Sequence, residues 1–368
     1  MKVITVFGTR PEAIKMCPLI MELKKKSNIE CIVCLTGQHK EMLNQVMKAF
    51  NIQEDYNLDI MHERQTLTSI TTMILEKLEP ILQQEKPDVI LVHGDTTTSF
   101  SAALAAFYQQ IPVGHVEAGL RTGNIYSPYP EEMNRLLTGR LATYHFAPTE
   151  KNKNNLSIEN ISQNVYITGN TVIDSFKTTV IRDYQFKNEI LRKLDFVNRR
   201  VIVVTAHRRE NLGEPLQNIC RAIKNIAQEY KDVDFAYPVH MNPAVRDTAY
   251  SILADVDNIK LIEPLDVLDM HNLISRSYMV MTDSGGLQEE APAFGKPVLV
   301  LRTETERPEA VEAGTARVVG VCEENIYRET KLLLEDPKVY DSMAHAVNPY
   351  GDGHASERIV EVLVKELE

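Results

Sequence analysis

The chain has 368 residues, of which 43% are hydrophobic and 25% are charged. This length favours two domains of ordinary size, and the composition is typical of a globular protein, which excludes an intrinsically disordered chain. The formal net charge is −11, so the surface as a whole repels nucleic acids and anionic membranes. An anionic ligand would therefore need a local basic pocket.

No apolar run approaches the roughly 18 residues that span a bilayer. The apolar start of the chain is interrupted by Arg10 and Pro11, which argues against a signal peptide. The five cysteines are irregularly spaced, and Cys31 and Cys34 lie in an apolar run where we expect buried, reduced thiols. We therefore expect a cytoplasmic protein that binds neither membrane nor nucleic acid.

Short β-rich runs alternate with helical stretches along most of the chain. Apolar strands separated by amphipathic helices predict parallel sheets covered on both faces, and two such series predict two doubly wound domains. The runs of the first series are KVITVF, ECIVCLT, DVILVHG, PVGHVE and YHFAP, and those of the second are RVIVVTA, VDFAYPV, IKLIEP, YMVMTD and KPVLVL.

The join between the two series is expected near residues 165–174, after a polar segment. This gives an N-terminal Rossmann-like domain, 1–168, and a C-terminal Rossmann-like domain, 169–353. The tail reads as a turn and an amphipathic helix, 354–368. Ligands of open α/β sheets bind at the carboxyl ends of the strands, so the candidate site residues are those that follow each run.

The first two candidates follow the runs KVITVF and DVILVHG. Gly8 permits a tight turn and Arg10 supplies a bidentate donor, although a plain turn with a surface arginine is the alternative. This loop lacks the GxGxxG pattern, so a mechanism based on NAD has no support. Asp95 sits where its strand ends, either as a functional carboxylate or as a helix N-cap.

A third loop, VEAGLRTGNIYSPYPEEMNR, collects charged residues after the run PVGHVE. It carries three carboxylates and two guanidiniums, which are Glu117, Arg121, Glu131, Glu132 and Arg135. A solvated loop is the alternative explanation. Arg135 follows Glu131 by one helical turn, so we expect the guanidinium to hold that carboxylate.

In the second half, His207, Arg208 and Arg209 follow a strand and form a local anion site in an acidic protein, unless they are only a solvated basic loop. His240 occupies the corresponding place after the next strand.

The strongest single signal is SGGLQEEA, where Ser284, Gly285 and Gly286 open a helix after YMVMTD. Small residues there let a phosphate approach the free N–H groups at the positive end of the helix dipole. Glu290 could then reach the ribose hydroxyls, and Arg307 follows a later strand. Helix capping would explain the glycines but not the glutamate. No HExxH, no P-loop and no histidine pair at helical spacing occurs, so no metal site is expected.

These segments together resemble the non-hydrolysing UDP-N-acetylglucosamine 2-epimerases of bacteria, from residue 2 to the last helix and in the order of that family. The motifs are FGTRPEAIKM, HGDTTT, GHVEAGLRTG, YSPYPEEMNR, ITGNTVID, HRREN, PVHMNP, TDSGGLQEEAP, ERPEA and NPYGDG. The resemblance implies the glycosyltransferase B fold, an α/β fold with two Rossmann-like doubly wound domains facing across a cleft for the nucleotide sugar. It also implies that the last helix packs back on the first domain and that the enzyme is an isomerase, a homodimer, and free of cofactor and metal.

The resemblance further assigns roles to individual residues. The proposed catalytic residues are Asp95, Glu117, Glu131 and His207. The substrate and UDP contacts are Arg10, Lys15, Arg135, Met270, Ser284, Gly285, Gly286, Glu290 and Arg307. A second UDP-GlcNAc, an allosteric activator, would contact Gln38, Glu41, Arg64, Gln65, Arg208 and His240.

This sequence departs from the family at two positions. Met270 replaces a phenylalanine that faces the uracil, and Thr303 replaces an aspartate, so nucleotide selectivity stays open.

The implied reaction is reversible epimerisation at C2 of UDP-GlcNAc to UDP-ManNAc, which would supply ManNAc for cell-surface polysaccharide. Because C2 is not beside a carbonyl, its proton is hardly acidic, and elimination of UDP to 2-acetamidoglucal followed by re-addition is the expected route. Carboxylates would then act as base and acid, and the sequence does not tell which carboxylate has which role. The alternatives are a hydrolysing epimerase, a sugar transferase of the same fold, and an inactive nucleotide-sugar sensor.

Overall fold

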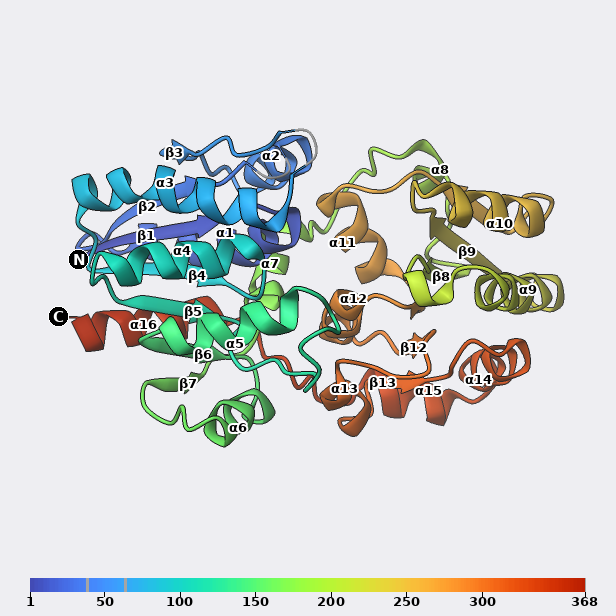
Figure 1. The fold of residues 1–368 in the computed structure, drawn as a ribbon. Helices are drawn as coiled ribbons and strands as arrows, with labels where there is room; N and C mark the ends of the chain where they lie inside the picture. Colours follow the sequence, from blue (N-terminus) through green and yellow to red (C-terminus); the bar gives the residue numbers. More distant parts are fainter. Residues whose placement is uncertain (38–39, 63–64, 368) are drawn as a thin grey trace. The chain divides into compact units, whose positions relative to one another are not determined.

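The computed structural model describes residues 1–37, 40–62 and 65–367. The chain divides into two compact units, which we treat separately (Figure 1). Unit 1 comprises Met1–Thr178 and the C-terminal segment from Tyr350, and unit 2 comprises Thr179–Pro349. The division falls later than the sequence suggested, because the stretch expected to join the domains forms a strand and a helix of unit 1.

Unit 1 is built on a seven-stranded parallel sheet with the order β3-β2-β1-β4-β5-β6-β7. Its strands are β1 (Lys2–Phe7), β2 (Glu30–Leu35), β3 (Tyr56–Asn57), β4 (Val89–His93), β5 (Val113–Val116), β6 (Tyr144–Ala147) and β7 (Val165–Ile167). The central strands β4 and β5 are buried along their whole length, as expected for a parallel sheet covered by helices on both faces.

The helices of unit 1 are α1 (Arg10–Lys25), α2 (Lys40–Ala49), α3 (Leu67–Glu85), α4 (Thr97–Tyr108), α5 (Glu131–Leu141), α6 (Glu150–Ile158), α7 (Thr171–Thr179) and α16 (Ala355–Leu367). The C-terminal helix α16, red in Figure 1, packs against α1. Asp174 of α7 accepts hydrogen bonds from the backbone N–H groups of Ala355 (3.2 Å) and Ser356 (2.7 Å) at the start of α16. The returning helix is thus capped by a buried carboxylate of the unit on which it packs.

Unit 2 has a six-stranded parallel sheet with the order β10-β9-β8-β11-β12-β13. Its strands are β8 (Arg200–Thr205), β9 (Val233–Pro238), β10 (Ile259–Ile262), β11 (Met279–Thr282), β12 (Val298–Val300) and β13 (Ala316–Val318). Its helices are α8 (Glu189–Arg192), η1 (Arg209–Asn211), α9 (Glu214–Glu229), α10 (Pro243–Leu253), α11 (Val267–Arg276), α12 (Gly285–Glu290), η2 (Ala291–Phe294), α13 (Pro308–Glu312), α14 (Glu323–Glu335) and α15 (Pro337–Ala344).

Both sheets reverse their winding direction at one place. In unit 1 the reversal lies between β1 and β4, and in unit 2 it lies between β8 and β11. Ligands of doubly wound sheets bind at such switch points, outside the carboxyl ends of the strands. The loops that follow β1, β4, β8 and β11 are therefore the places to look for a site.

The cysteines of the apolar run in β2 do not form a disulfide. Cys34 is buried and Cys31 is half-buried, and burial raises the pKa of each thiol to about 12. Both thiols are therefore protonated at neutral pH and unreactive. None of the helices in residues 1–37, 40–62 and 65–367 combines the length and apolar character needed to cross a membrane.

Candidate active site

Glu117 follows β5 and is the centre of a buried cluster in unit 1. Its backbone has φ of +63°, a left-handed conformation that costs a non-glycine residue roughly 1–2 kcal/mol. Its Oε2 atom accepts a hydrogen bond from Asn170 Nδ2 (2.9 Å), forms an ion pair with the ammonium of Lys15, and lies 3.5 Å from His93 Nε2. One oxygen of the carboxylate is thus held by donors from two separate parts of unit 1, Lys15 and Asn170, with His93 nearby.

Asp95 follows β4 and is held by Arg135 of α5. The N-cap of α4 is Thr96, so the capping role considered for Asp95 is wrong. Asp95 Oδ2 instead accepts from Arg135 Nε (2.9 Å) and lies 2.7 Å from Nη2. Arg135 Nη1 donates to Glu132 (2.8 Å), so the expected contact between Arg135 and Glu131 is also wrong. Helical spacing allows either partner, and the buried guanidinium turns to the carboxylate that is buried with it.

Glu131 is the first residue of α5 and is half-buried. Its Oε2 atom is fully buried and has no hydrogen-bond partner within the described part of the chain. A buried polar atom without a partner is costly unless a ligand supplies one. Glu131 is therefore the carboxylate of this loop that remains available to a bound molecule.

Substitution of the two neighbouring glutamates of α5 is expected to change the stability of unit 1 by very different amounts. Glu132 is 1% exposed and accepts from Arg135 and from the backbone N–H groups of Thr122 (2.9 Å) and Gly123 (3.0 Å). Glu132→Ala leaves those donors buried without an acceptor and should destabilise unit 1 by roughly 3 kcal/mol. Glu131→Ala should change its stability by no more than about 1 kcal/mol. Urea titration of both variants measures the contrast, and equal losses would contradict these environments.

The loop after β1 is closed by an internal carboxylate that the sequence reasoning missed. Glu12 Oε2 accepts from the backbone N–H groups of Gly8 (3.0 Å) and Thr9 (2.8 Å), and Oε1 accepts from Thr96 Oγ1 (2.6 Å). This carboxylate occupies the N–H groups to which a dinucleotide phosphate would bind in a Rossmann domain. Arg10 is half-buried at the start of α1 beside this loop. The sequence TRPE is a capping-box pattern that could have revealed Glu12.

In unit 2, His207 follows β8 and lies against the buried carboxylate of Asp283. Asp283 is 0% exposed, and its Oδ2 accepts from the N–H groups of His207 (2.7 Å) and Arg208 (2.8 Å) and from Asn211 Nδ2 (3.0 Å). The ring of His207 stacks on the ring of His240, with centroids 5.1 Å apart and planes at 8°. Burial lowers the pKa of His207, which favours the neutral imidazole at physiological pH.

The N-terminus of α12 is a second feature of unit 2. Ser284 precedes it, and no side chain of the described residues caps the helix. A Cβ atom placed on Gly285 would lie 3.7 Å from Arg307 Nη2 and 3.9 Å from Arg208 Nη2, and one on Gly286 would lie 3.9 Å from Ser284 Oγ. Two guanidiniums therefore flank the uncapped N–H groups, which is an arrangement suited to a pyrophosphate.

Glu290 and Met270 extend this surface along α12 and α11. Glu290 Oε2 lies 3.6 Å from His271 Nε2, and its side chain is 14% exposed. Met270 precedes His271 on α11 and is half-buried, while Thr303 is exposed in the segment after β12. Those of the expected nucleotide contacts that belong to unit 2 are thus grouped at one end of its sheet, whereas Arg10, Lys15 and Arg135 belong to unit 1.

Comparisons with known proteins show the family of this chain. The sequence profile of the UDP-N-acetylglucosamine 2-epimerase family matches residues 21–364. The Bacillus subtilis UDP-N-acetylglucosamine 2-epimerase is 56% identical over 366 residues, which cover 99% of this chain and 95% of that protein. The chain belongs to the UDP-N-acetylglucosamine 2-epimerase family.

Solved structures extend the likeness to three dimensions. The Neisseria meningitidis UDP-GlcNAc 2-epimerase, solved with UDP-GlcNAc bound, superposes with a TM-score of 0.91 at 53% identity, covering 99% of this chain and 100% of that one. S. aureus MnaA, solved with UDP, gives a TM-score of 0.90 at 52% identity, covering 100% of this chain and 96% of that one. The expected fold, two Rossmann-like domains of the glycosyltransferase B class, is confirmed.

The contacts that the family resemblance suggested for an activator are described only in part. Gln38 and Arg64 lie outside the described residues. Glu41 belongs to α2, and Gln65 Nε2 donates to the carbonyl oxygen of Ile60 (2.5 Å). Arg208 and His240, the other two members of this set, are the unit 2 residues beside α12 and His207.

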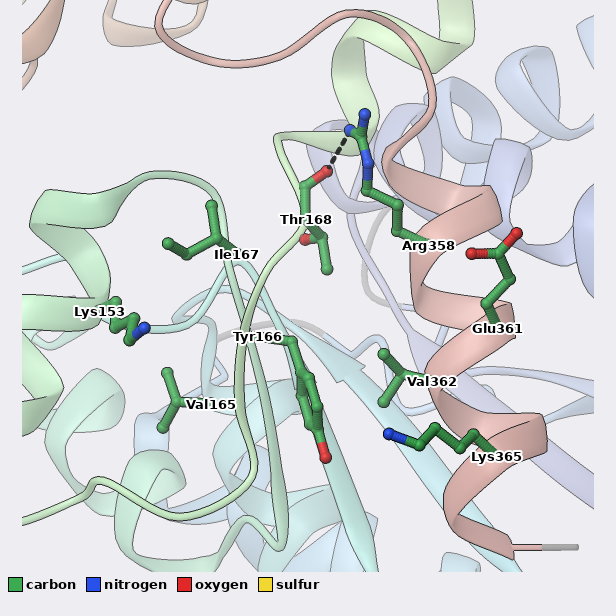
Figure 2. A pocket seen from close by; sticks show the side chains of 9 residues that line it. All are labelled: Lys153, Val165, Tyr166, Ile167, Thr168, Arg358, Glu361, Val362 and Lys365. Carbon is green, nitrogen blue, oxygen red and sulfur yellow. Dashed lines mark hydrogen bonds between the residues drawn. The ribbon is translucent and has the colours of Figure 1, made fainter.

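Unit 1 also has a pocket of about 480 Å³, and none of the residues expected in the active site lines it. Figure 2 shows Lys153 of α6 and Lys365 of α16 extending toward it, with Arg358 donating to the carbonyl oxygen of Thr168 (3.0 Å). Within the described parts of the chain, no group of three or more His, Cys, Asp or Glu side chains is arranged to hold a metal ion.

Proposed function

We propose that this protein catalyses the reversible epimerisation of UDP-GlcNAc to UDP-ManNAc at C2, by elimination of UDP and its re-addition without net hydrolysis. The observation that carries the proposal is the set of carboxylates at the strand ends of unit 1. Glu117 is held by donors, and Glu131 has a buried oxygen that no donor of the described residues reaches. Membership of the epimerase family supports the substrate, and the Neisseria relative was solved with UDP-GlcNAc bound.

The chemistry explains why such carboxylates are needed. The C2 proton of the sugar is hardly acidic, so its removal must be coupled to departure of UDP from C1, which leaves 2-acetamidoglucal. Return of UDP and protonation of C2 on the opposite face then give the epimer. A base and an acid on the two faces of C2 lower the barriers of both steps.

Three carboxylates of unit 1 would share these tasks. Glu117 has Oε2 held by Lys15 and Asn170, and these contacts would orient its carboxylate toward the substrate. Glu131 offers the buried Oε2 that lacks a donor. Asp95 is tied to Arg135, and this pair would act beside them. Either Glu117 or Glu131 would remove the proton from C2, and the other would deliver a proton to the opposite face. The two roles would exchange when the reaction runs in reverse.

The departing UDP would be held by unit 2. The uncapped N-terminus of α12 and the guanidiniums of Arg208 and Arg307 would neutralise the charge that develops on the pyrophosphate. Arg307 is oriented by an ion pair with Glu289, which is 1% exposed. Glu290, later on α12, would accept hydrogen bonds from the ribose hydroxyls, and Met270 would lie against the base.

Incubation with UDP-GlcNAc, followed by proton NMR, tests this proposal. We expect UDP-ManNAc to appear until a constant ratio of the two UDP-sugars is reached, from either starting sugar and without added metal or nicotinamide. Accumulation of free ManNAc with stoichiometric UDP would identify a hydrolysing epimerase instead. Turnover only after addition of an acceptor would identify a transferase.

We further propose that a second UDP-GlcNAc activates the enzyme, that the protein acts as a cytoplasmic homodimer, and that its product supplies ManNAc for cell-surface polysaccharide. The position of Arg208 beside α12 supports an activator bound next to the catalytic pyrophosphate.

Arg64→Ala is expected to reduce the stimulation of UDP-ManNAc turnover by added UDP-GlcNAc. The reason is that the resemblance assigns Arg64 to the activator and not to the reacting sugar. Initial rates at increasing UDP-GlcNAc measure the stimulation, and calorimetric titration with UDP checks that the catalytic site is intact. An unchanged stimulation would remove Arg64 from the activator site.

A further inference from the structure

We propose that Asp283 is a positioning residue that fixes the tautomer of His207, so that the Nε2 atom of His207 presents its lone pair to the reaction. The inference rests on the proposed function for the role of His207, and on the geometry of unit 2 for the role of Asp283. No catalytic contact by Asp283 itself is implied, because the carboxylate is 0% exposed.

The two oxygens of Asp283 have different surroundings. Oδ2 accepts three hydrogen bonds, from the N–H groups of His207 and Arg208 and from the amide of Asn211, at 2.7 to 3.0 Å. Oδ1 is buried, has no hydrogen-bond partner among the residues that the structure describes, and lies 3.6 Å from Nδ1 of His207. A small approach of the ring would therefore give this oxygen the donor that it lacks.

This contact decides where the imidazole carries its proton. An ionised carboxylate only accepts hydrogen bonds, so Nδ1 of His207 must be the protonated nitrogen when it faces Asp283. The neutral ring then has its lone pair on Nε2, on the side away from Asp283. There it can accept a proton, and the imidazolium that forms is stabilised by Asp283 and can return the proton.

The stacked ring of His240 provides an internal comparison. Its Nδ1 atom accepts a hydrogen bond from the backbone N–H of Asn242 (3.1 Å). A nitrogen that accepts has no proton, so neutral His240 carries its proton on Nε2. The two parallel rings are therefore expected to be opposite tautomers. The nitrogen-15 signals of His207 and His240 can be compared directly in one spectrum.

Asp283→Asn gives a sharp test because the three donors that face Oδ2 fix the orientation of the new amide. Its oxygen must take the Oδ2 position to satisfy the three donors, and its NH₂ group must take the Oδ1 position. The NH₂ group would then donate to Nδ1 of His207 and force the proton onto Nε2, the wrong tautomer. Asn211→Ala is the matched control, because it removes one donor to the same carboxylate and leaves the charge in place.

The experiment combines nitrogen-15 NMR of histidine-labelled protein with steady-state kinetics. In the unaltered protein we expect the Nδ1–H tautomer for His207 and the Nε2–H tautomer for His240. In Asp283→Asn we expect His207 to switch, kcat to fall by roughly 10²–10⁴-fold, and KM to change little. Asn211→Ala should keep the Nδ1–H tautomer and lose less than about tenfold in kcat.

The outcomes separate this inference from the proposed function. An Nε2–H tautomer of His207 in the unaltered protein would overturn the role of Asp283, even if Asp283→Asn failed to fold. Normal kcat in a folded Asp283→Asn protein would overturn it as well. Absence of epimerase activity in the unaltered protein would overturn the proposed function while the tautomer of His207 could still be read.

Discussion

Glu117→Gln is expected to lower kcat by roughly 10²–10⁴-fold, with UDP binding unchanged. The donors Lys15 and Asn170 face Oε2 of Glu117, so the oxygen of the new amide must take that position. The substitution removes the negative charge and replaces the carboxylate by an amide, which cannot act as a base. Initial rates of UDP-ManNAc formation measure kcat, and calorimetric titration measures the affinity for UDP.

Glu85→Gln is the matched control for this substitution. Glu85 also pairs with a lysine of unit 1, with Lys2 Nζ 2.9 Å away, but at the start of β1 instead of at the carboxyl ends of the strands. We expect full activity in this variant. Near-normal turnover in Glu117→Gln, or an equal loss in Glu85→Gln, would contradict the assignment of Glu117. Asp95→Asn should likewise lose most turnover and retain UDP binding, because the charge removed would belong to the proton-transfer step or its support and not to nucleotide recognition.

Gly285→Leu is expected to weaken UDP binding by roughly 10²-fold, which corresponds to the loss of one or two charge-assisted hydrogen bonds. The new side chain would stand at the uncapped N-terminus of α12, next to the guanidiniums of Arg208 and Arg307. Its Cβ atom meets no atom closer than 3.7 Å, so the fold accommodates the first carbon and the phosphate loses its approach. Calorimetric titration with UDP measures the effect.

The control for Gly285→Leu must add a comparable apolar side chain elsewhere on unit 2. Ala254→Leu does so at an exposed position after α10 and should leave the affinity for UDP unchanged. Thermal unfolding of Gly285→Leu should occur near the temperature of the unaltered protein, since leucine favours a helix more than glycine does. Unchanged UDP affinity in a folded Gly285→Leu protein would remove the pyrophosphate from the N-terminus of α12.

The apolar runs predicted most of the fold because long buried strands have a clear pattern. All ten runs became strands, from β1 in KVITVF to β12 in KPVLVL. The strands β3, β7 and β13 have only two or three residues and were not predicted. β12 is equally short, but its apolar run KPVLVL continues to Leu301 and was recognised. The stretch 165–174 was taken as a join because β7 is hidden in it.

The expectation that site residues follow the strands identified residues by their place in the chain, but it could not identify their hydrogen-bond partners. It selected Asp95, Glu117 and His207, each of which follows a strand. It missed Glu12 and Asp283, whose carboxylates are satisfied by loops that come together only in the folded units. Such contacts join residues far apart in sequence, and no spacing along the chain records them.

The choice of partner for Arg135 shows the same limit on a smaller scale. Positions three and four residues earlier on a helix are both within reach of its side chain. The sequence favoured Glu131, whereas the structure pairs Arg135 with Glu132 and Asp95. Burial decides between the two glutamates, and it depends on how α5 packs against α4 and β5. As a result Glu131 Oε2 has no hydrogen-bond partner among the described residues.

Incubation with UDP-GlcNAc in D₂O tests the proposed elimination mechanism most directly. The proton removed from C2 meets solvent before UDP returns, so we expect deuterium at C2 of UDP-ManNAc and of the recovered UDP-GlcNAc. A small amount of UDP and 2-acetamidoglucal should also escape. UDP-ManNAc that forms with its C2 hydrogen fully retained, with no glycal at any time, would contradict elimination and the roles proposed for Asp95, Glu117, Glu131 and His207.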